Sequence, residues 1–194
     1  MSLDLPGFAD PVQGSQSTFR AVLEAMAHPG SVVTAGTDLT PPAPLCQSAA
    51  AMLLTLIDGD TSLHLAAEAE AAREWIVFHT TPRITEILGE AAFAMALTMP
   101  DLHRLAAGSD DGPEEGATLI LQVQGFGHGN RFDLSGPGLA TPRLVQIAGL
   151  PGNFALQWQE NHARFPRGVD LILCAGTALM ALPRSLRIAA VREG

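Results

Sequence analysis

The sequence predicts a mixed α/β fold, arranged as a three-layer α/β/α sandwich with a mixed sheet. Two short apolar runs, residues 117–123 and 169–174, lack polar alternation and are typical of strands buried on both faces. Segments with apolar residues at helical spacing alternate with such runs early in the chain, which is the pattern of parallel strands with crossover helices. Residues 117–134 resemble an antiparallel pair. Parallel and antiparallel strands in one chain therefore predict the mixed sheet.

Two helices are expected in the first third of the chain. Residues 1–14 are expected to form an irregular arm, after which Ser15 or Ser17 caps the first helix. An apolar stripe with helical spacing is expected to face the core. This stripe consists of Phe19, Val22, Leu23 and Met26. We expect His28 to cap the end of the helix, because a residue before proline is disfavoured in helical backbone. Residues 45–57 are apolar nearly all round and predict a buried second helix.

Short elements are expected in the middle of the chain. The apolar runs 63–65, 75–78 and 92–97 predict strands, and residues 84–88 predict a short helix. Residues 125–130 are rich in glycine and predict the turn of a hairpin. A dinucleotide-binding loop is the weaker alternative, because these residues lie between two strands and their glycine spacing is wrong.

A helix followed at once by a buried strand organises the C-terminal part of the chain. Residues 154–165 have apolar side chains at helical spacing, and the strand at 169–174 follows. Asp170 is a carboxylate at the start of this apolar strand, so it needs a partner or a place at the solvent edge. A strand at 186–191 ends the chain, and residues 1–194 are assigned to a single domain.

Composition excludes several classes of protein. The chain has 194 residues, of which 47% are hydrophobic and 16% charged, and this is too apolar for a disordered protein. A net charge of −9 argues against nucleic-acid binding, since phosphate contacts need a basic face. The longest strongly apolar helix candidate, 49–57, is far shorter than the ~20 residues of a membrane span. Cys46 and Cys174 make no disulfide framework and the start has no signal-peptide pattern, so we expect a cytoplasmic protein.

All eleven basic residues are arginines, and the chain has no lysine. A GC-rich genome, which favours arginine codons, is the simplest explanation of this composition. The chemical consequence is the same whatever the cause. Without a lysine amine the chain cannot form an aldimine with pyridoxal phosphate, so we expect no cofactor of this kind.

The sequence carries no recognisable catalytic or metal-binding signature. The six histidines never fall at HxH, HxxxH or HExxH spacing, and neither cysteine has a close partner. No serine-nucleophile elbow and no phosphate-binding Walker loop is present. We therefore assign no catalytic residue and expect no metal site.

Ser135-Gly136-Pro137-Gly138 is a candidate for anion binding. Ser135 ends a predicted strand, and the backbone N–H groups of Gly136 and Gly138 can donate to an anion. Pro137 has no N–H, which favours the alternative of a tight turn that ends the strand. Both interpretations stay open.

Two arginines and one aspartate are further candidates for contacts with a ligand or a partner. Arg184 can hold a phosphate or a partner's carboxylate through its fork of donors. The alternative for Arg184 is a salt bridge within the chain, for which Asp170 is the candidate partner. Arg20 on the first helix is either a binding residue or a solvated arginine.

Six short motifs occur in a fixed order along the chain. They are Gln16-x-x-Phe19-Arg20, Ala25-Met26-x-x-Pro29-Gly30, Leu53-Leu54-Thr55-Leu56-x-Asp58, Leu134-Ser135-Gly136-Pro137-Gly138, Phe165-Pro166-x-Gly168-Val169-Asp170 and Leu182-Pro183-Arg184. Together they resemble the PhnH family, a subunit of the bacterial carbon–phosphorus lyase system, from Gly7 to about Ile188. The sequence departs from the family pattern at Arg167, where an aliphatic residue is expected, and at Ser185, where threonine usually stands.

The resemblance implies a fold similar to the large domain of pyridoxal-phosphate-dependent transferases, without the cofactor. It implies a core complex with the PhnG, PhnI and PhnJ subunits, which replaces the adenine of ATP with an alkylphosphonate at ribose C1. A radical SAM iron–sulfur step then cleaves the carbon–phosphorus bond, and two distant cysteines cannot hold that cluster here. The resemblance also implies that PhnI is the nucleosidase-type catalyst and that the isolated chain is a homodimer.

Three functions follow from these observations. The leading hypothesis is an auxiliary subunit of the carbon–phosphorus lyase core complex in organophosphonate catabolism. The alternative is a stand-alone small-molecule enzyme or binding protein with an arginine-lined anion site at Arg184 and residues 135–138. The third is a carrier of pyridoxal phosphate without aldimine chemistry, which a cofactor absorbance band would reveal.

Overall fold

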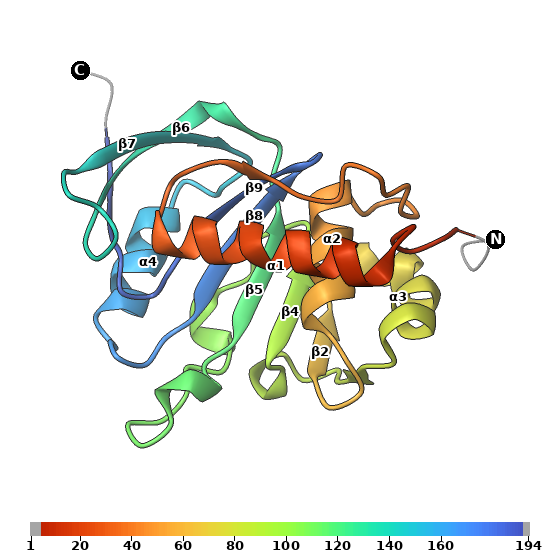
Figure 1. Ribbon diagram of the computed structural model, residues 1–194. Helices are drawn as coiled ribbons and strands as arrows, with labels where there is room; N and C mark the ends of the chain where they lie inside the picture. The colour runs from red at the N-terminus through yellow and green to blue at the C-terminus, as the bar shows by residue number, and fades with distance from the viewer. Residues whose placement is uncertain (1–4, 192–194) are drawn as a thin grey trace.

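The computed structural model describes residues 5–191, which contain a large mixed β-sheet (Figure 1). Its seven strands have the order β1-β9-β8-β5-β4-β2-β3. In that order their bounds are β1 Val33–Thr34, β9 Ala178–Leu182, β8 Asp170–Ala175, β5 Thr118–Gln122, β4 Phe93–Ala96, β2 Ser62–Leu65 and β3 Arg83–Ile84. The strands from β8 to β3 pair in parallel, whereas β9 pairs antiparallel with both β8 and β1. The predicted mixed sheet is confirmed.

A second, three-stranded antiparallel sheet has the order β10-β6-β7. It consists of β10 (Arg187–Ala190), β6 (Gly125–Ser135) and β7 (Arg143–Ala148). The sequence does not predict this sheet, because prolines on both sides of β7 make that segment look like a loop. The predicted antiparallel pairing within residues 117–134 is wrong, since β5 lies between β4 and β8 and does not pair with β6.

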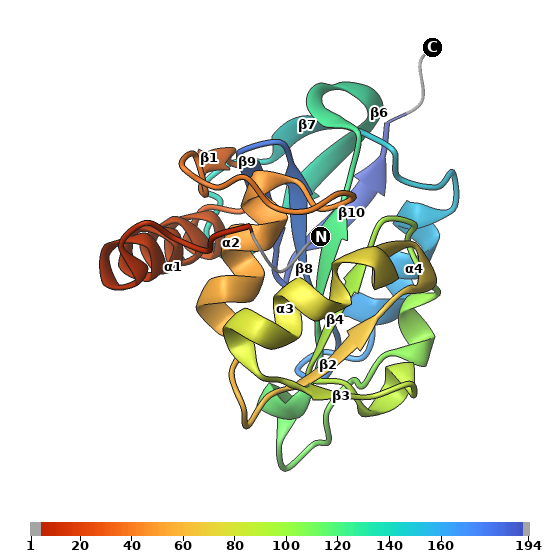
Figure 2. The same cartoon turned by 90° about the vertical axis from the view of Figure 1, so that its right-hand side faces the viewer.

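Helices cover both faces of the larger sheet. The helices of the described residues are α1 (Pro11–Ala27), α2 (Gln47–Leu56), α3 (Arg73–Thr80) and α4 (Phe154–His162), with 3-10 turns η2 (Ala67–Ala72), η3 (Leu88–Glu90), η4 (Leu102–Arg104) and η5 (Pro113–Glu115). Figure 2 shows α1 and α2 on one side of the larger sheet and α4 on the other. The helices predicted at 45–57 and before residue 169 are confirmed, with shorter bounds.

The larger sheet is buried on both faces, because successive strand residues point in opposite directions. In β5, Ile120 packs into the core formed with α2, while Leu119 and Leu121 pack into the core shared by α4 and the second sheet. In β8, Ile172 likewise packs into the first core and Leu173 into the second. Each of these five side chains is at most 2% exposed, and such burial contributes ~1.5–3 kcal/mol per side chain. The two predicted doubly buried strands are confirmed.

Helix α1 begins earlier than the sequence predicts. It starts at Pro11, and the Asp10 carboxylate accepts hydrogen bonds from the backbone N–H groups two and three positions later, at 3.0 and 3.1 Å. Proline suits this first position, because an N–H there would have no helical partner. The expected irregular arm at 1–14 is therefore wrong from Pro11 onward, and Asp10 replaces the predicted serine cap. Residues 1–4 of that arm lie outside the described residues.

The buried face of α1 is also rotated from the predicted one. Thr18, Val22 and Ala25 are buried, whereas Phe19 and Leu23 are 48% and 52% exposed. The smaller side chains face the core, where α1 packs closely on α2 and β9. Two large apolar side chains are consequently left on the outer surface of the helix.

Residues 75–78 belong to α3 and not to a strand. Trp75 and Ile76 are fully buried while Phe78 is exposed, which is the one-sided pattern of a helix against a core. β-Branched and aromatic residues suggest a strand, but packing of one face outweighs that preference. The short helix expected at 84–88 is wrong as well, because β3 and η3 occupy its two ends.

Residues 125–130 lie inside β6 and do not form a hairpin turn. Phe126 and Asn130 both pair with Ile147 of β7, so the three residues between them are extruded as a bulge. Gly127 and Gly129 have φ angles of +82° and +86°, a region that favours glycine. The glycine-rich composition therefore marks a bulge rather than a turn.

Asn161 joins α4 to the start of β8. Its side chain is only 2% exposed. The side-chain Nδ2 donates to the Val169 carbonyl at 2.9 Å, and Oδ1 accepts from the Val169 N–H at 2.8 Å. One amide side chain thus satisfies both the N–H and the C=O of Val169, which is buried and cannot form these hydrogen bonds with water.

Replacing Asn161 by alanine is expected to leave those two backbone groups unpaired. We expect Asn161→Ala to lower the free energy of unfolding by about 2–4 kcal/mol, since each unsatisfied buried group costs ~1–3 kcal/mol. Urea unfolding followed by circular dichroism measures this loss. The control is Glu160→Ala on the exposed side of the same helix, for which a change within ~0.5 kcal/mol is expected. Equal stability of the two variants would contradict the role of the amide.

Candidate functional site

Asp170 and Arg184 form an ion pair beside the start of β8. The two residues meet because β8 and β9 pair antiparallel, with Leu171 opposite Leu182. The guanidinium donates to one carboxylate oxygen from Nε at 3.0 Å and from Nη2 at 2.6 Å, and the Arg184 backbone N–H donates to the other oxygen at 2.7 Å. The arginine and aspartate side chains are 13% and 17% exposed. Asp170 thus has the partner that its place in an apolar strand requires.

The other donors of Arg184 bind backbone carbonyls. Nη1 donates to the Pro113 carbonyl at 2.5 Å, and Nη2 donates to the Gly116 carbonyl at 3.4 Å. A Cβ at Gly116 would collide with the guanidinium, so glycine is needed for this approach. Of the two alternatives for Arg184, the structure contains the salt bridge, and the guanidinium lies in the interior instead of lining an open anion site.

The backbone of Arg184 also orients a histidine. His162, the last residue of α4, has its Nδ1 at 3.2 Å from the Arg184 carbonyl oxygen. A carbonyl only accepts hydrogen bonds, so Nδ1 carries the proton and Nε2 of the neutral ring is left as an acceptor. The ring stacks on Phe165 with centroids 6.4 Å apart and planes at 27°. Two of the family motifs therefore hold one half-buried imidazole in a defined orientation.

A hollow of about 400 Å³, which we call the His162 hollow, lies where α4 meets β6 and β10. Its polar lining residues are Asp133, Ser135, Gln159, His162 and Arg187. Ser135 and Arg187 are directly opposite each other in the β6–β10 pair. The exposed guanidinium of Arg187 and the hydroxyl of Ser135 can donate hydrogen bonds to a small polar anion, and the imidazole of His162 can accept a proton from it.

The two glycines after Ser135 pack against different segments, Gly136 against residues 185–187 and Gly138 against the end of α1. Gly138 has a φ of +83°, and a Cβ there would lie 2.5 Å from the Ala27 carbonyl oxygen. The Leu139 N–H donates to the Gly136 carbonyl at 3.2 Å and closes a turn. The tight-turn alternative is therefore present in the structure, and neither Gly136 nor Gly138 lines the His162 hollow.

Arg20 stands apart from the other candidates. It lies on the exposed side of α1, beside Phe19 and Leu23, and no residue of α1 lines the His162 hollow. Within residues 5–191, Arg20 makes no salt bridge. The structure thus brings Asp170, Arg184 and Ser135 to one end of the molecule and leaves Arg20 on a separate surface.

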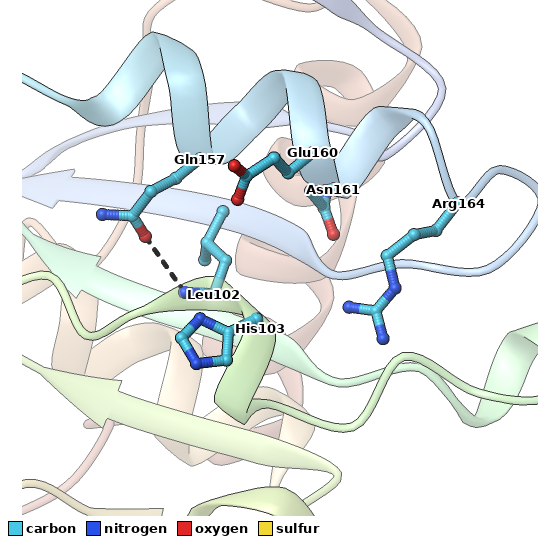
Figure 3. A pocket seen from close by; sticks show the side chains of 6 residues that line it. All are labelled: Leu102, His103, Gln157, Glu160, Asn161 and Arg164. Atoms are coloured by element: carbon cyan, nitrogen blue, oxygen red, sulfur yellow. Dashed lines mark hydrogen bonds between the residues drawn. The ribbon is translucent and has the colours of Figure 1, made fainter.

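A second hollow, of about 220 Å³, separates α4 from η4 (Figure 3). Figure 3 shows His103 on one wall and Glu160 and Arg164 on the other. Gln157 in this hollow accepts a hydrogen bond from the Leu102 N–H at 3.1 Å, and the Asn161 amide is committed to β8. Two of its polar side chains therefore hold the fold together, which leaves fewer groups for a ligand than in the His162 hollow.

The described residues 5–191 contain no cluster of three or more His, Cys, Asp or Glu side chains placed to hold a metal ion. No helix in this part of the chain has the length and apolarity needed to span a membrane.

Burial raises the pKa of the Cys174 thiol, Cys46 raises it further, and a hydrogen bond with Ser48 opposes the shift. A thiol held in its protonated form is a poor nucleophile, so Cys174 serves packing.

Sequence reasoning did not single out Arg187 and Asp133 as lining residues. They meet Ser135 and His162 through the second sheet, whose β6–β10 pairing joins residues far apart in the chain. Ser135 is the polar lining residue that the sequence indicates as a candidate. A motif at the end of one strand indicates a special position but does not identify its neighbours.

Comparison with protein families identifies the class of this α/β protein. A family model described as bacterial phosphonate metabolism protein (PhnH) matches residues 6–189. The match includes every helix of the described residues and nearly all of the strands. The chain belongs to the PhnH family, as the six motifs indicate.

Two curated relatives align over most of their length. The alpha-D-ribose 1-methylphosphonate 5-triphosphate synthase subunit PhnH of Rhizobium meliloti is 36% identical over 186 residues, which are 93% of this chain and 93% of the relative. The putative C-P lyase subunit protein HtxG of Stutzerimonas stutzeri is 32% identical over 182 residues, covering 89% of this chain and 85% of the relative. Both relatives are named as subunits of larger systems.

The Asp170–Arg184 pair is expected to show strong energetic coupling. In a cycle of Asp170→Ala, Arg184→Ala and the double variant, we expect each single change to cost about 2–4 kcal/mol with a coupling energy of roughly 1.5–3 kcal/mol, because one partner alone is left buried and unpaired. Urea unfolding measures the cycle. The exposed pair Arg167–Asp110, with side chains 41% and 82% exposed, is the matched control, and its coupling should be about 0.5 kcal/mol or less. Similar coupling energies in both pairs would contradict the conclusion that Asp170 and Arg184 depend on each other within the fold.

Proposed function

We propose that this chain is an auxiliary subunit of the carbon–phosphorus lyase core complex in organophosphonate catabolism. In this role it supports the step in which an alkylphosphonate replaces adenine at ribose C1 of ATP. The observation that carries the proposal is the family match over residues 6–189, together with two relatives that are named as subunits of a synthase and of a lyase. The partners are the PhnG, PhnI and PhnJ counterparts, and the complex works in the cytoplasm.

The positions of the family motifs support a structural role. Asp170 and Arg184 use their charges within the chain, and Gly138 serves a close contact with α1. In contrast, Phe19 and Arg20 of the first motif lie on an exposed helix surface. Exposed large apolar side chains grouped on one face are typical of an interaction surface.

In isolation, the chain is proposed to be a homodimer through the outer face of α1. Val12, Phe19 and Leu23 are at least 48% exposed and recur at i, i+7 and i+11 on this helix. In an antiparallel pair of α1 helices with a two-fold axis level with residue 22, Arg20 of one copy lies opposite Glu24 of the other. This charge complementarity and the shared apolar stripe favour a second copy as the occupant of this face.

The finer features of the fold belong to the same proposal. Helices on both faces of the seven-stranded mixed sheet support a three-layer α/β/α sandwich. The likeness to the large domain of pyridoxal-phosphate-dependent transferases, without the cofactor, remains our inference from the family. The sequence has no lysine to hold that cofactor as an aldimine.

One observation favours a second candidate, a stand-alone enzyme or binding protein. The His162 hollow combines an oriented imidazole with Ser135 and Arg187. In this version Arg187, rather than the internal Arg184, supplies the cation of the anion site. Such a protein would act on a small polar anion without any partner.

The subunit proposal predicts that the complex fails without this chain. When the four genes are co-expressed with a tag on the PhnI counterpart, this chain should co-purify with it. Omitting the chain should lower ATP-dependent and alkylphosphonate-dependent adenine release by about 10-fold or more. Normal assembly and activity without the chain would refute the proposal. The second candidate is tested on the isolated chain, where saturable anion binding or turnover that His162→Ala abolishes would place chemistry in the His162 hollow.

The dimer is expected to depend on the outer face of α1. The double change Phe19→Ser and Leu23→Ser should convert the dimer to a monomer, while the half-exposed positions limit the loss of stability to roughly 1 kcal/mol. Light scattering coupled to gel filtration measures the mass. Phe78→Ser, which changes an exposed phenylalanine on α3, is the matched control and should stay dimeric. A dimeric double variant would rule out this interface.

A further inference from the structure

Figure 2 shows β1, β9 and the curved β6–β7 ribbon at the same end of the molecule. A groove lies there, lined by residues of both sheets. It consists of two adjoining hollows of about 580 and 330 Å³ that share Val32, Phe126 and Gly127. The second hollow is also lined by Arg131 and Leu144. We call the whole feature the Arg131 groove. None of its lining residues belongs to the His162 hollow.

The groove lies at the carboxyl ends of two parallel strands. Gln124 follows the end of β5, and Ala175 and Gly176 stand at the end of β8, and all three line the first hollow. β5 and β8 are neighbours and run parallel. The first hollow therefore lies beside the carboxyl-end edge of the larger sheet.

Arg131 is a cation in this groove without a counterion. Its Nε is buried and has no hydrogen-bond partner, and the guanidinium makes no salt bridge to any residue between 5 and 191. Gln146, directly opposite in β7, is the nearest neighbour across the strands and is uncharged. A buried donor of a charged group that lacks an acceptor is costly. An acceptor from outside the chain would remove that cost.

Apart from Arg131 and two uncharged glutamines, Gln124 and Gln146, the lining consists of apolar residues and glycines. Val32 and Leu144 are 50% and 51% exposed, although both border a concave surface. Met180 and Phe126 also line the hollow. A cation at one point of an apolar groove is the arrangement of a site for an organic molecule with one charged end.

The bulge in β6 forms one border of the groove. Gly127 lines both hollows, and a Cβ there would have no atom within 4 Å, so the border has open space beside it. His128 at the tip of the bulge is held by a contact of 3.2 Å between its Nδ1 and the Phe126 carbonyl oxygen. Asn130 anchors the far end of the bulge by donating to the Leu150 carbonyl at 3.1 Å. The glycine-rich stretch thus shapes one border of the groove.

We propose that the Arg131 groove binds a small organic anion, a carboxylate or phosphate-type group attached to an apolar body. The anion accepts hydrogen bonds from Arg131, and the apolar body lies against Phe126, Val32 and Leu144. The site uses neither the outer face of α1 proposed for the dimer nor the His162 hollow of the second candidate.

Isothermal titration calorimetry of the full chain with three probes tests the proposal. Phenyl phosphate carries both the anion and an apolar ring, inorganic phosphate carries only the anion, and benzyl alcohol carries only the ring. We expect saturable binding of phenyl phosphate that is clearly tighter than binding of the other two. Equal binding of inorganic phosphate would overturn the role of the apolar lining, and equal binding of benzyl alcohol would overturn the role of Arg131.

Two variants locate the binding. Arg131→Gln should weaken phenyl phosphate binding by roughly 10- to 100-fold, the usual loss for a hydrogen-bonded charge. Leu144→Glu places a carboxylate diagonally across the strands from Arg131 and should weaken binding as much. Because Leu144 is half exposed, this second variant decides the question if Arg131→Gln fails to fold.

Arg104→Gln is the matched control, since it removes the same charge from an exposed arginine outside the groove. It should bind phenyl phosphate like the unmodified chain. Unchanged binding in Leu144→Glu or in folded Arg131→Gln would overturn the proposal. An absence of saturable binding by the unmodified chain at millimolar phenyl phosphate would overturn it too.

Discussion

The ion pair between Asp170 and Arg184 is the constraint on which the C-terminal half of the chain depends. It ties the start of β8 to the residues after β9, and the other donors of Arg184 reach the loop before β5. The carbonyl of the same arginine orients His162 at the end of α4. A pair of low exposure gains little net free energy over apolar side chains. Its effect is positional, because any other docking of these segments would leave a buried charge without its partner.

The sequence predicts those elements whose burial is decided locally. The runs that became β5 and β8 are apolar on both faces, so they indicate central strands without reference to any partner. The three-stranded sheet could not be predicted in this way. β7 lies between two loops that contain proline, and its pairing with β6 depends on a bulge that no periodicity reveals. The strand predicted at residues 75–78 is wrong for a related reason, since strand-like composition does not show that only one face of this segment is buried.

Helix α1 illustrates a second limit of periodicity. The pattern correctly identifies a helix, but two stripes of the helix are eligible for the core. The stripe with Val22 and Ala25 is chosen because small side chains allow a close approach to α2, and the stripe with Phe19 and Leu23 is left outside. Helical spacing cannot tell which of the two stripes is buried, because the choice depends on the distance to the neighbouring helix and the sequence pattern gives no such distance. Of the candidate site residues, Arg20 is consequently the one that falls on a different surface from Ser135, Asp170 and Arg184.

The two arginines Arg184 and Arg131 show why residue type alone does not define a site. Arg131 lies within β6 and Arg184 follows β9, and both are partly withdrawn from water. Arg184 has a carboxylate 14 positions earlier in the chain that the β8–β9 pairing brings within 2.6 Å. Arg131 faces an uncharged glutamine across β6–β7, and its Nε has no acceptor. Because a desolvated guanidinium requires a compensating acceptor, the difference between a structural arginine and a binding arginine lies in what the strand pairing places opposite it. Asp133 lies two positions along the same strand, yet Arg131 makes no salt bridge to it or to any other residue between 5 and 191, so the acceptor is left for a ligand to supply.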